Sequence, residues 1–196
     1  MLAALIDIPP NVGYAAVFGL IAIETMGIPV PGETALIAAA LLAHDGQLDV
    51  VALVAIAAAA AIIGDNVGFA IGRHGGRRLL LRPGPFLAQR ERVIELGEPF
   101  FAKHGPKAVF LGRWVSGLRI ASAWLAGING MSWPVFLVWN ALGGILWACV
   151  VGFGVYLLGD VAEKILTVAG PAAAGTFVLL VIGVLYVRHR RGSRSG

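Results

Sequence analysis

Long apolar runs constrain this chain of 196 residues more than any other feature. The apolar residues gather in four stretches, at about 12–43, 48–72, 108–130 and 133–187. The last stretch is interrupted at Gly159-Asp160 and divides into spans near 134–158 and 166–187. A membrane-crossing helix needs about 20 apolar residues. Only 13% of the residues are charged, against about a quarter in soluble domains. The sequence therefore predicts an all-α polytopic membrane protein and excludes a soluble globular enzyme.

The distribution of basic residues predicts which loops face the cytoplasm. Residues 1–72 contain no lysine or arginine, whereas residues 73–107 contain eight and the tail 188–196 contains four. Basic residues concentrated in short loops beside apolar spans mark the cytoplasmic side of a membrane. We therefore expect an inner (plasma) membrane protein with a cytoplasmic C-terminus. Because long apolar runs flank both basic clusters, a nucleic-acid partner is not expected.

The orientation of the spans predicts that one segment enters and leaves on the same face. Span 48–72 runs from outside to inside, and the tail is also inside, so the chain must cross an even number of times between Lys107 and Arg188. Three apolar segments lie there. Segment 108–130 carries two arginines, which a straight helix would point in different directions into lipid. We predict that it is a re-entrant hairpin, broken near Ser116-Gly117 and open to the cytoplasm.

The first stretch has a similar interruption. Residues 12–43 are too long for one ordinary span and contain Pro29, Pro31 and Gly32. Because proline cannot continue helical hydrogen bonding, we expect half-helices at about 13–27 and 32–43 that form a hairpin open to the outside. The order then reads as hairpin, span, hairpin, span and a final span. This is the pattern of an inverted repeat, and the alternative is a plain bundle of kinked helices.

Two further patterns concern packing. Small residues recur every fourth position in both central spans, at Ala60, Gly64, Gly68 and Gly72 and again at Gly144, Ala148 and Gly152. Small residues at this spacing let helices approach closely in lipid, so we expect the two spans to touch each other or a neighbouring hairpin, with a homodimer interface as the weaker alternative. In the loop 73–107, residues 86–101 predict an amphipathic helix on the inner membrane surface, which Pro99 should end or bend, with a partner-binding helix as the less favoured alternative.

Four charged residues lie inside the predicted hairpins, namely Glu24, Glu33, Arg113 and Arg119. An isolated charge near the bilayer centre costs about 2.5–3.5 kcal/mol, so these groups must pair, take up protons or line water. Arginine offers a planar fork that suits phosphate, and the start of the second half-helix offers free N–H groups. A carboxylic acid in an apolar setting can carry a proton. We favour a functional site, and the alternative is a structural salt-bridge clamp.

Asp65 lies in span 48–72 and extends the possible polar path. The alternative is a carboxylate that reaches the inner interface or pairs with Arg73. Asn140 is expected to form an interhelical hydrogen bond. No arrangement of residues indicates a metal site, a cofactor site or a Ser/His/Asp triad.

Three sequence blocks resemble the signatures of the DedA family of membrane proteins, also called the SNARE-associated or VTT-domain family. They are residues 24–33 (ETMGIPVPGE), 64–73 (GDNVGFAIGR) and 110–119 (FLGRWVSGLR). Residues 126–131, followed by Asn140, Gly144 and Trp147, continue the match. Ser116 stands where the third signature usually has proline.

The resemblance implies two facing re-entrant hairpins, membrane acids at Glu24 and Glu33, and essential arginines at Arg113 and Arg119. It also implies lipid translocation, either recycling of undecaprenyl phosphate or scrambling of phospholipids, with dependence on the proton motive force in some members. The motif positions expected to shape the hairpins are Pro29, Pro31, Gly32, Gly112 and Gly117.

We therefore expect a transporter, not an enzyme, that moves a phosphorylated lipid between leaflets. Arg113 and Arg119 would bind the phosphate. Glu24 and Glu33 would balance those arginines when the site is empty and carry protons during the cycle, and Asp65 would also take part in proton coupling. One alternative is a proton-coupled transporter of small solutes, cations or drugs. Another is a membrane lipid phosphatase, although the chain offers no suitable nucleophilic histidine or clear metal cluster.

Overall fold

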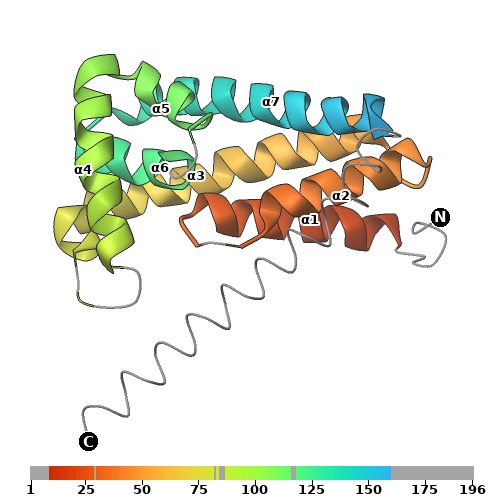
Figure 1. Cartoon of the computed structure of the whole chain (residues 1–196), viewed down its shortest axis with the longest axis horizontal. Helices are drawn as coiled ribbons and strands as arrows, with labels where there is room; N and C mark the ends of the chain where they lie inside the picture. Colours follow the sequence, from red (N-terminus) through yellow and green to blue (C-terminus); the bar gives the residue numbers. More distant parts are fainter. Residues whose placement is uncertain (1–8, 29, 82, 84–86, 116–117, 160–196) are drawn as a thin grey trace, which may run out of the picture. The chain divides into compact units, whose positions relative to one another are not determined.

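The computed structural model describes residues 9–159, apart from positions 29, 82, 84–86 and 116–117. The chain divides into two units, Met1–Leu157 and Leu158–Gly196, and everything below concerns the first. Its described residues form helices α1 (Pro10–Thr25), α2 (Gly32–His44), α3 (Val50–Leu80), α4 (Leu87–His104), α5 (Lys107–Gly112), α6 (Leu118–Ile128) and α7 (Trp133–Leu157) (Figure 1). The all-α prediction is confirmed for this part of the chain.

Helices α3 and α7 are long and apolar enough to cross a membrane, over Val50–Gly76 and Trp133–Leu157. They match the predicted spans 48–72 and 134–158, but α3 continues past Arg73 to a kink at Gly76, where φ is 58°. The two helices lie side by side (Figure 1). A Cβ at Gly152 would lie 2.6 Å from Val54, and one at Gly144 would lie 3.3 Å from Ile62. The α7 stripe thus permits close packing on α3, whereas the α3 stripe faces the neighbouring helices: Gly64 approaches α1, and Gly68 and Gly72 approach Trp124 of α6. Both outcomes agree with the prediction that the spans touch each other or a neighbouring hairpin.

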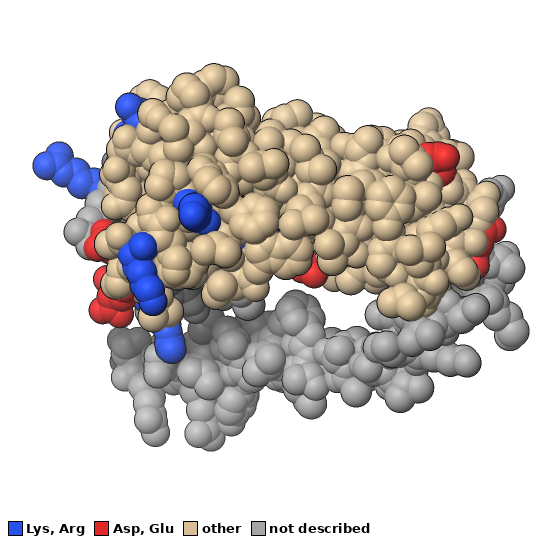
Figure 2. All heavy atoms as spheres, turned by 90° about the horizontal axis from the view of Figure 1, so that it is seen from above, with Lys and Arg blue, Asp and Glu red and all other residues tan. Residues whose placement is uncertain are grey.

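The helix pair α3–α7 is antiparallel, and side-chain contacts define its two ends. At one end His44 Nδ1 lies 2.8 Å from the carbonyl oxygen of Tyr156, close to the loop that leads into α3. At the other end Arg73 donates from Nη1 to the carbonyl oxygen of Met131, across 2.7 Å. Figure 2 shows most of the charged side chains toward the two ends of the visible face, with a largely uncharged surface between them that one acidic patch interrupts at about mid-length.

Helices α1 and α2 form a hairpin beside one half of α3. The hairpin begins near the start of α3, where Tyr14 accepts a hydrogen bond from the amide of Asp49 across 2.9 Å. It ends beside Gly64, about midway along the span Val50–Gly76, where a Cβ would lie 2.0 Å from Thr25 Oγ1. Gly27 turns the chain between the helices with a φ of 108°. The first hairpin therefore reaches only to the middle of α3.

Helices α5 and α6 approach the same level from the opposite end. A Cβ at Gly127, near the end of α6, would lie 2.3 Å from the carbonyl oxygen of Phe69 and 2.7 Å from the amide of Arg73. The end of α5 lies near the middle of α7, since a Cβ at Gly143 would be 3.5 Å from Cα of Phe110. The predicted segment 108–130 thus contains two helices, separated by a non-helical stretch after Gly112.

Helix α4 bears on two expectations for the amphipathic segment 86–101. Pro99 does not end the helix, which continues to His104. The apolar face packs on protein: Ile94 and Phe101 are buried in the cluster that also holds Leu125 of α6. Charged side chains such as Glu91, Arg92 and Glu95 are exposed. The apolar pattern therefore covers α6, a neighbour that the sequence pattern alone did not identify.

Several expectations concern residues outside the described ones. They are the final span 166–187, the basic tail 188–196, the break at Ser116-Gly117 and the motif position Pro29.

Candidate functional site

Arg119, at the start of α6, contacts two carboxylates from the first hairpin. Its Nη2 donates to Glu24 Oε1 across 2.5 Å, and its Nη1 donates to Glu33 Oε2 across 2.7 Å. Glu24 lies at the end of α1, and Glu33 lies at the start of α2. One guanidinium fork thus joins both helices of the first hairpin to α6.

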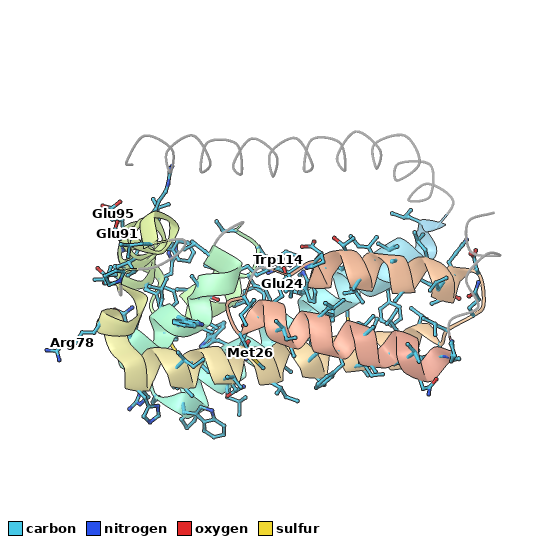
Figure 3. The ribbon with its side chains drawn as sticks, turned by 90° about the horizontal axis from the view of Figure 1, so that it is seen from below. Glu24, Met26, Arg78, Glu91, Glu95 and Trp114 are labelled. Atoms are coloured by element: carbon cyan, nitrogen blue, oxygen red, sulfur yellow. The ribbon has the colours of Figure 1, made fainter. Side chains whose placement is uncertain are left out.

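The start of α2 holds one of these carboxylates in place. The backbone amide of Glu33 donates to Glu24 Oε2 across 3.1 Å, so both oxygens of Glu24 have a donor. An N–H group at a helix start is free to bind an anion, and the helix dipole favours negative charge there. Gly32 makes this contact possible, because a Cβ at this position would lie 2.5 Å from Glu24 Oε2. Figure 3 shows Glu24 and Met26 near the end of α1.

Trp147 of α7 forms one wall of the Arg119 site. The guanidinium carbon of Arg119 lies 5.6 Å from the centroid of the Trp147 ring. Trp147 is 5% exposed, so it is part of the core as well as a neighbour of Arg119. This geometry is a cation–π contact, which favours the charged guanidinium and limits its orientation.

Arg113 forms a second cluster with different partners. It follows the last residue of α5 and donates from Nη2 to a carboxylate oxygen of Asp65 in α3. The same nitrogen donates to Asn140 Oδ1 of α7 across 2.9 Å, and Asn140 donates in turn to the carbonyl oxygen of Ile62 across 3.3 Å. The expected interhelical hydrogen bond of Asn140 is confirmed. Asp65 pairs with Arg113, whereas Arg73, the alternative partner, contacts Met131.

The two clusters lie about one helical turn apart along α7. Arg113 packs on Gly143, where a Cβ would lie 3.5 Å from its Cδ, and Arg119 packs on Trp147. The clusters differ in exposure. The side chains of Arg113 and Asp65 are 5% and 4% exposed, whereas those of Arg119 and Glu33 are 19% and 44% exposed. Only the Arg119 cluster is therefore open to a ligand in this conformation.

The charge within the two clusters does not balance. Arg113 and Arg119 face three carboxylates, those of Glu24, Glu33 and Asp65. The second oxygen of Asp65, Oδ1, is buried and has no hydrogen-bond partner. Buried acceptors are normally satisfied, and a charge in the middle of a membrane protein is normally neutralised. The arrangement can therefore accept a proton or another cationic group.

The motif positions that fall within the described residues have structural roles. Pro31 precedes α2, and Gly32 begins it. Gly112 ends α5, where a Cβ would lie 3.2 Å from Ser122 of α6. Position 117, like position 29, lies outside the described residues.

The sequence led us to expect that acids and arginines of the two hairpins neutralise one another, but it left open which acid each arginine contacts and did not identify Trp147 as a neighbour of Arg119. Both glutamates contact Arg119, while Arg113 contacts Asp65 instead. A tryptophan in an apolar helix is usually a packing residue, so nothing in the local sequence marked Trp147 as an arginine neighbour. Within the described residues, no three His, Cys, Asp or Glu side chains are grouped so as to hold a metal ion.

Comparisons with known proteins identify the family to which this chain is similar. The VTT domain family matches residues 30–157. An uncharacterized membrane protein of Synechocystis sp. is 34% identical over 192 residues, which cover 96% of this chain and 88% of the relative. An uncharacterized membrane protein of Mycobacterium tuberculosis is 38% identical over 165 residues, covering 82% and 76%.

A third relative carries a family name. The protein DedA of Escherichia coli is 30% identical over 180 residues, which cover 89% of this chain and 77% of the relative. No solved structure matches the chain significantly. The family match covers more than half of the chain and includes Glu33, Asp65, Arg113 and Arg119. The chain therefore belongs to the VTT-domain family of membrane proteins, to which DedA gives its other name.

Proposed function

We propose that this protein transports a phosphorylated lipid, such as undecaprenyl phosphate or a phospholipid, between the two leaflets of the membrane. The observation that carries the proposal is the position of Arg119. Two hairpins bring this guanidinium to the middle of the α3–α7 pair, where it contacts two carboxylates and remains 19% exposed. A partly open arginine suits a phosphate group, and a lipid could leave its chains in the bilayer while its head group crosses.

The lengths of the hairpin helices support a re-entrant arrangement. At 1.5 Å per residue, the 16 residues of α1 and the 13 residues of α2 span about 24 Å and 20 Å, against about 30 Å for the hydrocarbon core. Glu24 at the end of α1 also contacts Arg119 at the start of α6, about midway along α3 and α7, and the two helix pairs reach this level from opposite ends. We therefore propose two re-entrant hairpins of opposite sense, related as an inverted repeat, with the head-group site at their contact.

The excess of acidic groups supports proton coupling. Glu24 and Glu33 share one arginine, and Asp65 has an unsatisfied oxygen beside the other. We propose that these three carboxylates take up and release protons as the head group binds and leaves. Each charge that crosses 100 mV contributes about 2.3 kcal/mol, which can drive a head group against its gradient.

Arg113 would be the second phosphate ligand after a rearrangement. In this conformation Asp65 and Asn140 occupy its guanidinium, and the pair is almost fully buried. Protonation of Asp65 would weaken that pair and leave Arg113 available to the phosphate held by Arg119, one turn away along α7.

The same acidic excess favours a second candidate, a proton-coupled cation or drug transporter. In that case Glu24, Glu33 and Asp65 would bind the cation, and the arginines would only modulate their charge. Flux assays with a labelled lipid and with a soluble organic cation separate the two functions, because a head-group carrier transports only the former.

Reconstituted vesicles provide the direct test. We expect Arg119→Ala to abolish movement of fluorescent phosphatidylglycerol or fluorescent polyprenyl phosphate between leaflets, and Arg113→Ala to do the same. Arg78→Ala is the matched control, since Arg78 is exposed at the far end of α3 and projects away from the helices (Figure 3). Transport that persists in folded Arg119→Ala protein would contradict the proposal.

A further inference from the structure

The two glutamates that contact Arg119 are not equivalent. The Glu24 side chain is 9% exposed and uses both of its oxygens, one for Arg119 and one for the amide of Glu33. The Glu33 side chain is 44% exposed and contacts the other arm of the guanidinium. Glu33 therefore lies on the open side of the site, whereas Glu24 occupies its interior.

The environment of Glu24 has the features of a binding site for a small anion. An arginine N–H group and a backbone N–H group converge on the two oxygens of one carboxylate, across 2.5 Å and 3.1 Å. Phosphate oxygens use the same two kinds of donor. Gly32 has no side chain, and a Cβ at this position would lie 2.5 Å from Glu24 Oε2, the oxygen that accepts from the amide of Glu33. The backbone is therefore shaped to let an anion approach this amide.

We propose that the Glu24 carboxylate occupies the position of the substrate's anionic head group in the empty protein, so that head-group binding is an exchange with Glu24. This inference rests on the proposed function and assigns different roles to the two glutamates. The head group displaces Glu24 from Arg119 Nη2 and from the amide at the start of α2. Glu33 keeps its contact with Nη1 and lies beside the route by which the head group enters.

An exchange of this kind has a measurable consequence for affinity. A tethered carboxylate is always present, so the substrate sees only the fraction of molecules in which the position is vacant. The apparent dissociation constant is the intrinsic one divided by that fraction, so it rises as the fraction falls. While the head group is bound, the displaced carboxylate remains tethered beside it and competes for the same donors, which speeds release. Removing its charge should therefore tighten binding and slow turnover.

Binding to purified full-length protein in detergent tests the exchange. The probes are geranyl phosphate, a prenyl phosphomonoester, and dihexanoyl phosphatidylglycerol, a phosphodiester, with affinity measured by titration calorimetry. We expect Glu24→Gln to lower the Kd of at least one probe by about tenfold, because the competing anion is gone. Glu33→Gln is the matched control: it removes a charge from the same guanidinium but leaves Glu24 in place, so its effect should be under about fivefold.

A second variant separates exchange from simple charge balance. Glu24→Asp keeps the charge but shortens the side chain by one methylene, so one carboxylate no longer reaches both donors. Exchange predicts tighter probe binding for Glu24→Asp, whereas a counterion role predicts wild-type affinity. In vesicles, Glu24→Gln should lower both the half-saturating lipid concentration and the maximal rate of translocation.

The outcomes distinguish this inference from the function on which it rests. If neither wild type nor Glu24→Gln binds a probe, the proposed head-group site is wrong. If wild type binds, Arg119→Ala does not, and Glu24→Gln and Glu24→Asp bind no more tightly than wild type, the site stands and the exchange is overturned. Tighter binding of only one probe supports the exchange and identifies the phosphate class that the position accepts.

Discussion

The indole ring of Trp147 lies beside the guanidinium of Arg119, with 5.6 Å between the ring centroid and the guanidinium carbon. Two carboxylates hold the polar edge of the same guanidinium. When a head group replaces one of those carboxylates, the ring still contacts Arg119. Trp147 is thus positioned to keep the arginine charged and oriented throughout an exchange of its anionic partners.

Substitution of Trp147 should weaken head-group binding, and the loss should be smaller when the new side chain is aromatic. The ring contacts Arg119 in both the empty and the occupied site, so only the part of the contact that orients the guanidinium for the ligand affects affinity. We therefore expect Trp147→Leu to raise the Kd of geranyl phosphate by less than the roughly 2- to 30-fold that corresponds to a whole cation–π contact of about 0.5–2 kcal/mol. Trp147→Phe should retain part of the contact and show a smaller increase. Both variants leave space in the core, so a melting temperature measured for each separates packing from binding. Equal affinities for the two variants would exclude an aromatic role.

Loss of the Asp65 carboxylate should destabilise the protein. Asp65→Asn leaves the buried Arg113 without a charged partner, and breaking a buried pair costs about 3–5 kcal/mol. The double variant Asp65→Leu with Arg113→Met removes both charges and should recover much of that stability, because well-packed apolar replacements are tolerated. Melting temperatures in detergent of the wild type, Asp65→Asn and the double variant measure these changes in stability. Transport should remain absent in the double variant.

A double variant that stayed as unstable as Asp65→Asn would mean that the cost arises elsewhere, for example from Asn140. Asn140 would then lack the Arg113 donor while keeping its bond to Ile62. Asn140→Leu in the double-variant background decides between these explanations.

Much of the helical framework followed from local sequence patterns. Apolar runs predicted α3 and α7, and proline with glycine predicted the break before α2, because these residues act on backbone geometry and burial directly. The charges inside the hairpins marked the site because an isolated charge within a membrane is energetically costly. The partner of each arginine could not be predicted, because Asp65 lies in α3 while Glu24 and Glu33 lie in the first hairpin, and only tertiary packing selects among them.

Two local patterns in α4 left more than one outcome open. Pro99 was expected to end or bend α4, and the helix does not end there but continues to His104 while it packs on α6. The apolar face of α4 was assigned to the membrane surface because an amphipathic pattern does not reveal which apolar partner covers it. A protein partner, α6, covers much of that face.

Close packing of α1 on α3 should depend on Gly64. A Cβ there would lie 2.0 Å from Thr25 Oγ1 and 2.4 Å from the carbonyl oxygen of Ala22, so Gly64→Ala must separate the helices. Overpacking of this kind costs about 1–3 kcal/mol and should lower the melting temperature. Gly154→Ala is the matched control: nothing lies within 4 Å of its Cβ position, and alanine favours the helix. A similar effect of both substitutions would show that helix propensity, not contact, controls stability at position 64.

The two ends of the α3–α7 pair should be accessible from opposite sides of the membrane. Gln47 lies in the exposed loop before α3, and Asn129 lies in the exposed loop before α7. In a Cys149→Ser background, which removes the natural cysteine, we expect a membrane-impermeant maleimide to label Gln47→Cys from outside the cell. Asn129→Cys should react only after the membrane is opened, since its loop lies beside Arg73 at the basic end of the bundle. Labelling of both positions from one side would be incompatible with α3 and α7 as single crossings, and with them the arrangement of hairpins that brings Arg119 to Glu24.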